Sequence, residues 1–155
     1  MIETLIAFLL ALPHVEIETS AAAREHIDAA QAAATDRFPA AILLAIGWEE
    51  SRLRMSDQSV ATYGNGVAKR CGPGHANSYG SARRCAWLKR PFGAYRAVRD
   101  QLERRMREDM PGQPMAVILA GFGCKVGRHR MPRCTRYAAR VLDLSGRISA
   151  QGVSP

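Results

Sequence analysis

The chain shows little that would place it in a membrane. Its N-terminal apolar run, from Leu5 to Leu12, is too short to span a bilayer and lacks the basic flank of a signal peptide. Acidic residues stand on both sides of the run, at Glu3, Glu16 and Glu18. We therefore expect a packed first helix here and no transmembrane segment.

The chain also contains no C-x-x-C pair, which argues against a zinc ribbon or a thioredoxin-like motif. An even count of cysteines in a small protein suggests two disulfides, although four cysteines allow three pairings. Cys71 with Cys85, and Cys124 with Cys134, would close short local loops. Four buried free thiols are the alternative.

Disulfides would place the site of action outside a reducing cytosol, in the periplasm, the cell wall or the extracellular medium. Because the N-terminal run is not an evident export signal, we expect another exit route, such as host lysis or delivery by a phage particle.

Acidic side chains are outnumbered. Asp and Glu number 14 against 22 Lys and Arg, so the formal net charge is +8 and the surface should attract polyanions such as nucleic acid, anionic lipid or the bacterial cell wall. The excess is spread without a dense block, so a solvated basic face is the simpler alternative. A helix-turn-helix signature is missing, and we expect no nucleic acid partner.

The length of 155 residues, 47% of them hydrophobic, suits one compact domain. We expect a monomer with a single domain over 1–155, divided into N-terminal helices (1–37), a catalytic core (38–148) and a tail (149–155).

Most of the chain has the pattern of helices. Ser20 and the alanine-rich stretch after it indicate a capped helix to Thr35, and Pro39 suits the first turn of the next one. Residues 40–54 are apolar at nearly every position through Trp48, which predicts a buried central helix. Apolar residues at helical spacing predict further helices over 91–110, 115–122 and 135–148.

A small β-lobe is expected between these helices. β-Branched and aromatic residues over 59–71 surround Gly64-Asn65-Gly66, which indicates a hairpin turn. The stretch 72–81, rich in Gly, Pro, Asn and Ser, is typical of an irregular loop, and such loops often line sites. The fold class is therefore α+β, mainly α-helical, with a minor hairpin.

Two adjacent carboxylates, Glu49 and Glu50, end the apolar helix. A carboxyl group in apolar surroundings has a raised pKa and can act as a general acid, as glycoside cleavage requires. The alternative is an ion pair between Glu50 and Arg54 on the helix surface. Helical periodicity does not choose between the two glutamates.

The segment Ala41 to Leu53 (AILLAIGWEESRL) resembles the motif of soluble lytic transglycosylases, in which an apolar helix ends in Glu-Ser. These enzymes belong to the lysozyme-like superfamily and include phage endolysins and virion-associated muralytic enzymes. The resemblance implies a lysozyme-like fold with a central helix and a small β-hairpin lobe. It makes Glu50 the catalytic acid and Ser51 a residue that shapes the site.

Three further motifs follow in order. The sequence Cys71-Gly72-Pro73-Gly74-His75 resembles the Gly-Leu-Met-Gln or Gly-Pro-Met-Gln loop, with Gly74 in place of Met and His75 in place of Gln. The sequence from Ala120 to Cys124 is similar to Ala-Tyr-Asn-Ala-Gly, with Phe122 replacing Tyr and Gly123 replacing Asn.

The segment from Thr135 to Leu142 resembles the closing helix of the family, with Tyr137 as a candidate partner of Glu50 or simply a core aromatic. The missing Gln, Tyr and Asn remove hydrogen-bonding groups that the family has at these positions.

The resemblance implies cleavage of the β-1,4 bond between N-acetylmuramic acid and N-acetylglucosamine in peptidoglycan glycan strands, without a metal or cofactor. A transglycosylase would leave a 1,6-anhydro end. Hydrolysis on the same fold usually requires a second carboxylate, for which Asp57 is the candidate. His75 could donate a hydrogen bond to sugar, and Trp48, Trp87 or Tyr79 could stack on it, although we expect Trp87 to pack against a disulfide.

Two other classes of function stay open. A basic nucleic-acid-binding protein could use the helices between Ser81 and Arg107 to neutralise phosphates. An inactive wall-binding or virion structural protein would keep the fold without the chemistry.

Overall fold

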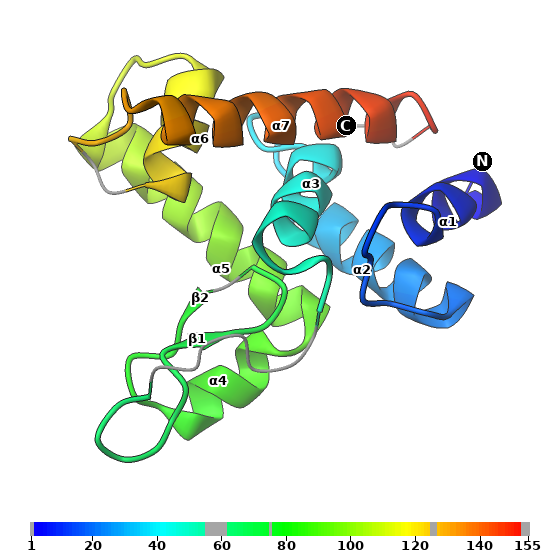
Figure 1. The fold of residues 1–155 in the computed structure, drawn as a ribbon, viewed down its shortest axis with the longest axis horizontal. Coiled ribbons are helices and arrows are strands. Elements are labelled where there is room, and N and C mark those ends of the chain that lie inside the picture. Colours follow the sequence, from blue (N-terminus) through cyan, green and yellow to red (C-terminus); the bar gives the residue numbers. More distant parts are fainter. Residues whose placement is uncertain (1, 55–61, 75, 125–126, 153–155) are drawn as a thin grey trace.

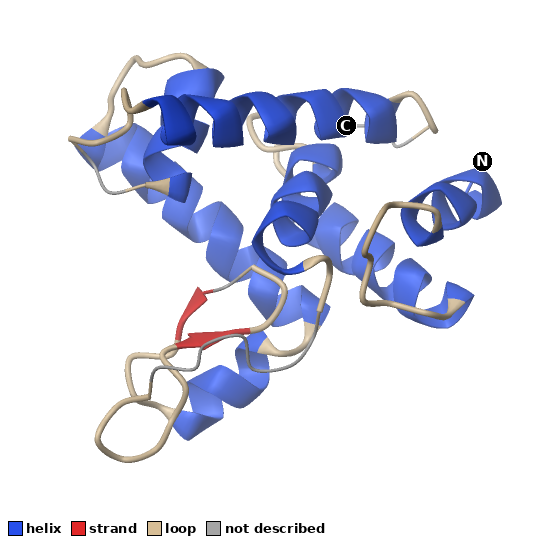
Figure 2. Ribbon diagram, in the orientation of Figure 1, coloured by secondary structure: helices blue, strands red, loops and turns tan. Residues whose placement is uncertain are grey.

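The computed structural model describes residues 2–54, 62–74, 76–124 and 127–152. It is mainly helical with one small two-stranded antiparallel sheet, which confirms the expected α+β class (Figure 2). The helices are α1 (Ile2–Leu10), α2 (Ser20–Ala33), α3 (Ala40–Ser51), α4 (Ala82–Leu88), α5 (Pro91–Arg104), the π-helical turn η1 (Arg105–Asp109), α6 (Met115–Gly123) and α7 (Pro132–Ser149). The strands are β1 (Arg70–Cys71) and β2 (Ala76–Asn77).

Helix α3 lies at the centre of the helical part, in contact with α7, α2 and α5 (Figure 1). Every residue from Ala40 to Gly47 is buried, as its uniformly apolar sequence predicts. The helix ends at Ser51, three residues before the expected end, because Arg52 and Leu53 adopt left-handed backbone conformations (φ 58° and 66°). The carboxylates therefore stand in its last turn.

The N-terminal helices cover one side of this core. Helix α1 buries Leu5, Ile6 and Leu9, so the short apolar run does pack as a first helix. Helix α2 is capped by Thr19 rather than Ser20, since the Thr19 Oγ1 accepts a hydrogen bond from the Ala22 amide at 3.1 Å. No helix in the described part of the chain has the length and apolar character needed to cross a membrane.

The small lobe, which comprises the described residues from 62 to 88 with β1, β2 and α4, differs from the expected hairpin. The turn at Gly64-Asn65-Gly66 forms, but one isolated bridge between Thr62 and Ala68 closes it. The sheet is instead formed by β1 and β2, with Arg70 opposite Asn77 and Cys71 opposite Ala76, inside and beside the stretch expected to be irregular.

Gly72 lies directly after β1, where the chain turns toward α4. It has φ +71°, and a Cβ atom there would lie 1.7 Å from the Leu88 carbonyl oxygen, so only glycine fits where the strand turns against α4. The prediction of an irregular loop over 72–81 therefore holds for its described residues except the strand β2.

Helix α4 was not among the helices predicted from apolar spacing. It begins at Ala82, and the hydroxyl of its N-cap residue, Ser81, accepts a hydrogen bond from the Arg84 amide at 3.1 Å. The helices over 91–110, 115–122 and 135–148 are confirmed with small shifts of their ends. The last turn of the first of these is wound as the π-helix η1, and α7 begins three residues early with a proline in its first turn.

Both expected disulfides are present, Cys71–Cys85 and Cys124–Cys134, and free thiols are therefore ruled out for the four cysteines. The first joins β1 to α4 within a small apolar cluster that is separate from the main core. The second joins the end of α6 to the first turn of α7.

Candidate active site

The two glutamates at the end of α3 face different surroundings. Arg140 of α7 donates from its Nε to both carboxylate oxygens of Glu49, at 3.0 Å each. Only 5% of the Glu49 side chain is exposed. Glu49 thus fastens α3 to α7, a role that sequence periodicity could not assign.

Glu50, one residue later, lines a pocket of about 310 Å³ that we call the acid pocket. Its other lining residues come from β1, the turn after it, α5, η1, α6 and the residue that follows α6: Arg70, Gly74, Gln101, Arg105, Phe122, Gly123 and Cys124. The side chain of Arg54, the expected ion-pair partner of Glu50, donates to Glu16 at 2.5 Å. Glu49 lines a different pocket, where Arg140 binds it, so the two glutamates differ in their neighbours.

Ser51 holds the small lobe against α3. Its Oγ lies 3.0 Å from the carbonyl oxygen of Gly47 and 2.9 Å from that of Pro73, and the residue is buried. Pro73 precedes Gly74, where a Cβ atom would lie only 2.4 Å from the Val98 side chain. The close approach of this turn to α5 explains a glycine at the position where the resembling family has methionine.

Tyr137 of α7 lies beside Glu50. Burial raises the pKa of the Tyr137 phenol, and the charge and acceptor oxygens of the Glu50 carboxylate raise it further. The hydroxyl is nevertheless buried without a hydrogen bond of normal length and geometry, so the two groups approach without a complete bond. The phenol stays protonated and is available as a donor toward Glu50.

Gly123 leaves the space that the Tyr137 ring occupies. A Cβ atom at Gly123 would lie 2.5 Å from the ring Cδ1 and 2.7 Å from Cγ. An asparagine at this position, as in the resembling family, would collide with the ring. Glycine at position 123 and tyrosine at position 137 are therefore sterically matched.

The structure brings Glu50, Phe122 and Tyr137 into one region, with Ser51 behind them. Phe122 is half-buried and supplies an apolar wall of the acid pocket. Asp57 and His75, the other two candidates, lie outside the described residues. The Cys124–Cys134 disulfide links the Phe122 segment to the helix that carries Tyr137.

Two polar residues of the acid pocket, Gln101 and Arg105, were not singled out in the sequence. The Arg105 side chain is 13% exposed, and its Nε is buried without a hydrogen-bond partner. Burial lowers the pKa of its guanidinium, while Asp109, 4.0 Å away, raises it. Arg105 begins the π-helical turn, a local structure that is frequent at functional sites.

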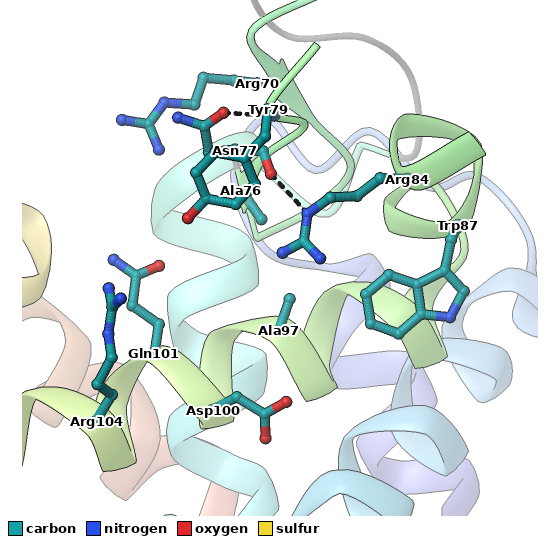
Figure 3. A pocket seen from close by; sticks show the side chains of 10 residues that line it. All are labelled: Arg70, Ala76, Asn77, Tyr79, Arg84, Trp87, Ala97, Asp100, Gln101 and Arg104. Atoms are coloured by element: carbon teal, nitrogen blue, oxygen red, sulfur yellow. Dashed lines mark hydrogen bonds between the residues drawn. The ribbon is translucent and has the colours of Figure 1, made fainter. Parts of the chain in front are cut away.

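A second pocket, of about 390 Å³, shares Arg70 and Gln101 with the acid pocket, so the two are continuous. We call it the distal pocket (Figure 3). Helix α5 supplies its floor through Ala97, Asp100, Gln101 and Arg104, and the small lobe supplies Arg84 and Trp87 opposite them. The spacing of these α5 residues, i, i+3, i+4 and i+7, is the sequence signal for one polar helix face.

Within the described residues, no three His, Cys, Asp or Glu side chains are grouped so that they could hold a metal ion. Comparison of the chain with protein families, with curated proteins and with solved structures found no match to any of them.

Proposed function

We propose that this protein is a peptidoglycan lytic transglycosylase of the lysozyme-like type, with Glu50 as its general acid and base. The observation that carries the proposal is the difference in surroundings between the two carboxylates: Arg140 binds Glu49, whereas Glu50 lines the acid pocket with Phe122 and lies beside the Tyr137 phenol. A carboxyl group beside an apolar wall is the group that cleavage of a glycosidic bond requires. The sequence motifs around Glu50 support this choice.

The reaction needs one carboxyl group for two proton transfers. The Glu50 carboxyl group donates its proton to the oxygen between N-acetylmuramic acid and N-acetylglucosamine, and that oxygen leaves C1 with the bonding electron pair. The carboxylate then accepts the proton of the muramic C6 hydroxyl while O6 bonds to C1. The products are a 1,6-anhydro end and a free hydroxyl, and no water is consumed.

Neighbouring residues fit supporting roles in this reaction. Tyr137 is a positioning residue, because its buried neutral phenol can only donate toward the Glu50 carboxylate. Ser51 positions the turn that lines the opposite side of the pocket. Phe122 offers an apolar surface next to the acid, against which a sugar ring could pack.

The charge and the disulfides support a site of action at the cell wall. A net charge of +8 attracts the carboxylates and anionic polymers of a wall at long range, and more strongly at low salt. Two disulfides favour the periplasm, the wall or the medium over a reducing cytosol. Host lysis or delivery by a phage particle is part of this proposal.

The experiment that tests the proposal compares the wild type, Glu50→Gln and Glu49→Gln on purified peptidoglycan. The wild type should release anhydro-muropeptides, identified by mass as lighter by one water than hydrolytic products. Loss of the acid should lower the rate roughly 10²–10⁴-fold. Glu49→Gln should keep most of the rate, and thermal unfolding identifies any loss that comes from the broken ion pair. Equal turnover by wild type and Glu50→Gln would remove Glu50 from the mechanism.

Other results of the same experiment would support other functions. Reducing ends instead of anhydro ends would indicate a hydrolase, and a loss of activity in Asp57→Asn would identify its second carboxylate. Wall binding without any release would indicate an inactive binding or virion structural protein. Salt-sensitive binding of duplex DNA without wall binding would indicate a nucleic-acid-binding protein.

A further inference from the structure

The distal pocket has features that the cleavage reaction does not use. It opens from the acid pocket past Arg70 and Gln101 and extends between α5 and the small lobe. Aromatic and cationic side chains are combined there, which is the composition expected of a site for a ring that carries an anionic group.

The Trp87 indole packs on α5 and stays partly exposed. A Cβ atom at Gly93 of α5 would lie 2.3 Å from the Trp87 carbonyl oxygen and 2.8 Å from the ring Cδ2, so the indole rests directly on a glycine. Its exposed fraction is 38%, large for a tryptophan. In Figure 3 the ring stands at the edge of the pocket beside Ala97. A platform of this kind suits stacking of a sugar ring.

Arg84 is fixed by a backbone oxygen rather than by a carboxylate. Its Nε donates to the Asn77 carbonyl oxygen at 2.9 Å, and its guanidinium lies 5.1 Å from the Tyr79 ring centroid and 6.0 Å from that of Trp87. Figure 3 shows its terminal nitrogens directed into the pocket above Ala97. The fork geometry of a guanidinium oriented in this way matches a carboxylate.

The charge of the pocket is not balanced by its own carboxylate. Asp100 accepts from Arg99 at 2.9 and 2.5 Å and is therefore already paired. Arg104 is exposed, and no carboxylate of the described residues forms an ion pair with it or with Arg84. The pocket consequently presents positive charge on both sides of the Ala97 floor.

Tyr79 adds a strained backbone to this site. Its φ of +51° is rare for a bulky residue, and 66% of the residue is exposed. The Asn77 Oδ1 holds this conformation by accepting from the Tyr79 amide at 2.7 Å, and it also accepts from the Tyr63 hydroxyl at 2.6 Å. These hydrogen bonds of Asn77 stabilise the turn that holds the exposed Tyr79 ring against the Arg84 guanidinium.

We propose that the distal pocket is a subsite for an acidic segment of the glycan strand, in which a sugar ring stacks on Trp87 and a carboxylate is bound by Arg84 and Arg104. This inference rests on the proposed function, since continuity with the acid pocket places the same polymer in both. The carboxylate belongs either to the lactyl group of muramic acid or to the peptide stem. The enzyme would then prefer acidic strands to neutral ones such as chitin.

Binding without turnover tests this subsite. The protein is the full-length Glu50→Gln variant, and calorimetry compares three tetrasaccharides: neutral chitotetraose, a peptide-free GlcNAc-MurNAc strand, and the same strand with its peptide stems. At least one acidic strand should bind about tenfold or more tightly than chitotetraose. The better of the two acidic strands identifies the source of the carboxylate.

Further substitutions in the Glu50→Gln protein test which residues cause the preference for acidic strands. Arg104→Gln, whose exposed side chain can be lost without disturbing the core, and Arg84→Gln should each remove most of the preference for acid. Trp87→Ala should weaken all three sugars. Arg96→Gln is the matched control, because Arg96 lies over the exposed Phe92 ring on the same helix and does not line the pocket.

Equal affinity for the neutral and both acidic strands would overturn the subsite, as would a preference that persists in both arginine variants. Competition by a single-stranded oligonucleotide at lower concentration than the sugars, lost in Arg84→Gln, would overturn it in favour of nucleic acid. Cleavage of the strand by Glu50→Gln, seen by mass after the titration, would contradict the proposed function and leave the binding comparison intact.

Discussion

Arg140 of α7 forms a symmetric ion pair with Glu49 of α3, because its Nε donates to both carboxylate oxygens at 3.0 Å. This pair joins two helices that are far apart in the sequence and pack closely in the fold. It also directs the last turn of α3, because fixing Glu49 against α7 leaves the next residue, Glu50, at the acid pocket. The ion pair and the acid pocket thus lie at adjacent positions of the same helical turn.

Arg140→Gln should destabilise the fold, since it leaves a nearly buried carboxylate without its partner. We expect a loss of about 1–3 kcal/mol in the free energy of unfolding, measured by urea denaturation. The control is Arg136→Gln, one turn earlier on α7 and exposed, which should change stability by less than about 0.5 kcal/mol. Equal stability of wild type and Arg140→Gln would show that the pair is not structural.

Gly123→Ala should disturb the acid pocket. The new methyl group would lie 2.5 Å from the Tyr137 ring, so the ring or the end of α6 must move, at a cost of about 1–3 kcal/mol. Activity on peptidoglycan should fall as well. Gly146→Ala on α7 is the control: nothing lies within 4 Å of its Cβ position, and alanine should stabilise this helix by about 0.5–1 kcal/mol. Identical melting temperatures for the two variants would contradict the steric match.

Replacing Cys124 and Cys134 together by serine should lower stability by roughly 2–3 kcal/mol, because the bond closes a short loop. The same change at Cys71 and Cys85 should have a similar cost in stability, since the loop is of similar length. Their effects on function should differ: the first pair supports the Phe122 wall, and the second supports the small lobe and the distal pocket. Thermal unfolding and the two assays above measure both. Equal loss of peptidoglycan cleavage and of sugar binding in both variants would contradict this division.

Acid should destabilise the protein through His26. This fully buried side chain has its Nδ1 2.7 Å from the Tyr95 hydroxyl, and burial lowers its pKa from 6.5 to about 4. Between these values the unfolded chain binds a proton that the folded one does not, so stability is full above pH 6.5 and falls toward pH 4. The expected loss is on the order of 3 kcal/mol.

Urea denaturation of wild type and His26→Gln at pH 7, 5.5 and 4 measures this dependence. The variant should be less stable at pH 7 and should lose less stability as the pH falls. Parallel pH profiles for the two proteins would exclude His26 as the titrating group.

Local patterns were sufficient for the helices of the main core, because an apolar face at helical spacing must be buried somewhere. They failed at α4, a seven-residue helix whose Ser81 cap was the one available signal. They also misplaced the sheet, since strands of two residues are fixed by packing against α4 at Gly72 and not by alternation.

The choice between Glu49 and Glu50 could not be made from the α3 sequence alone, because that helix is buried on nearly every side. The deciding residue, Arg140, is distant in the sequence. In the same way, the match of Gly123 to Tyr137 and the glycine under Trp87 are contacts between elements. In the sequence, Gly123 is only a departure from the family motif. In the fold, its contact with Tyr137 gives the steric reason for the glycine.

The Ser51 hydroxyl has a single proton and two carbonyl oxygens within reach, one in its own helix and one at Pro73 in the small lobe. Separation of the lobes at this point would remove one of those acceptors and admit water to a buried group. The Ser51 hydroxyl therefore joins the small lobe to α3 directly beside Glu50, whereas the Cys71–Cys85 disulfide joins β1 to the helix that carries Trp87.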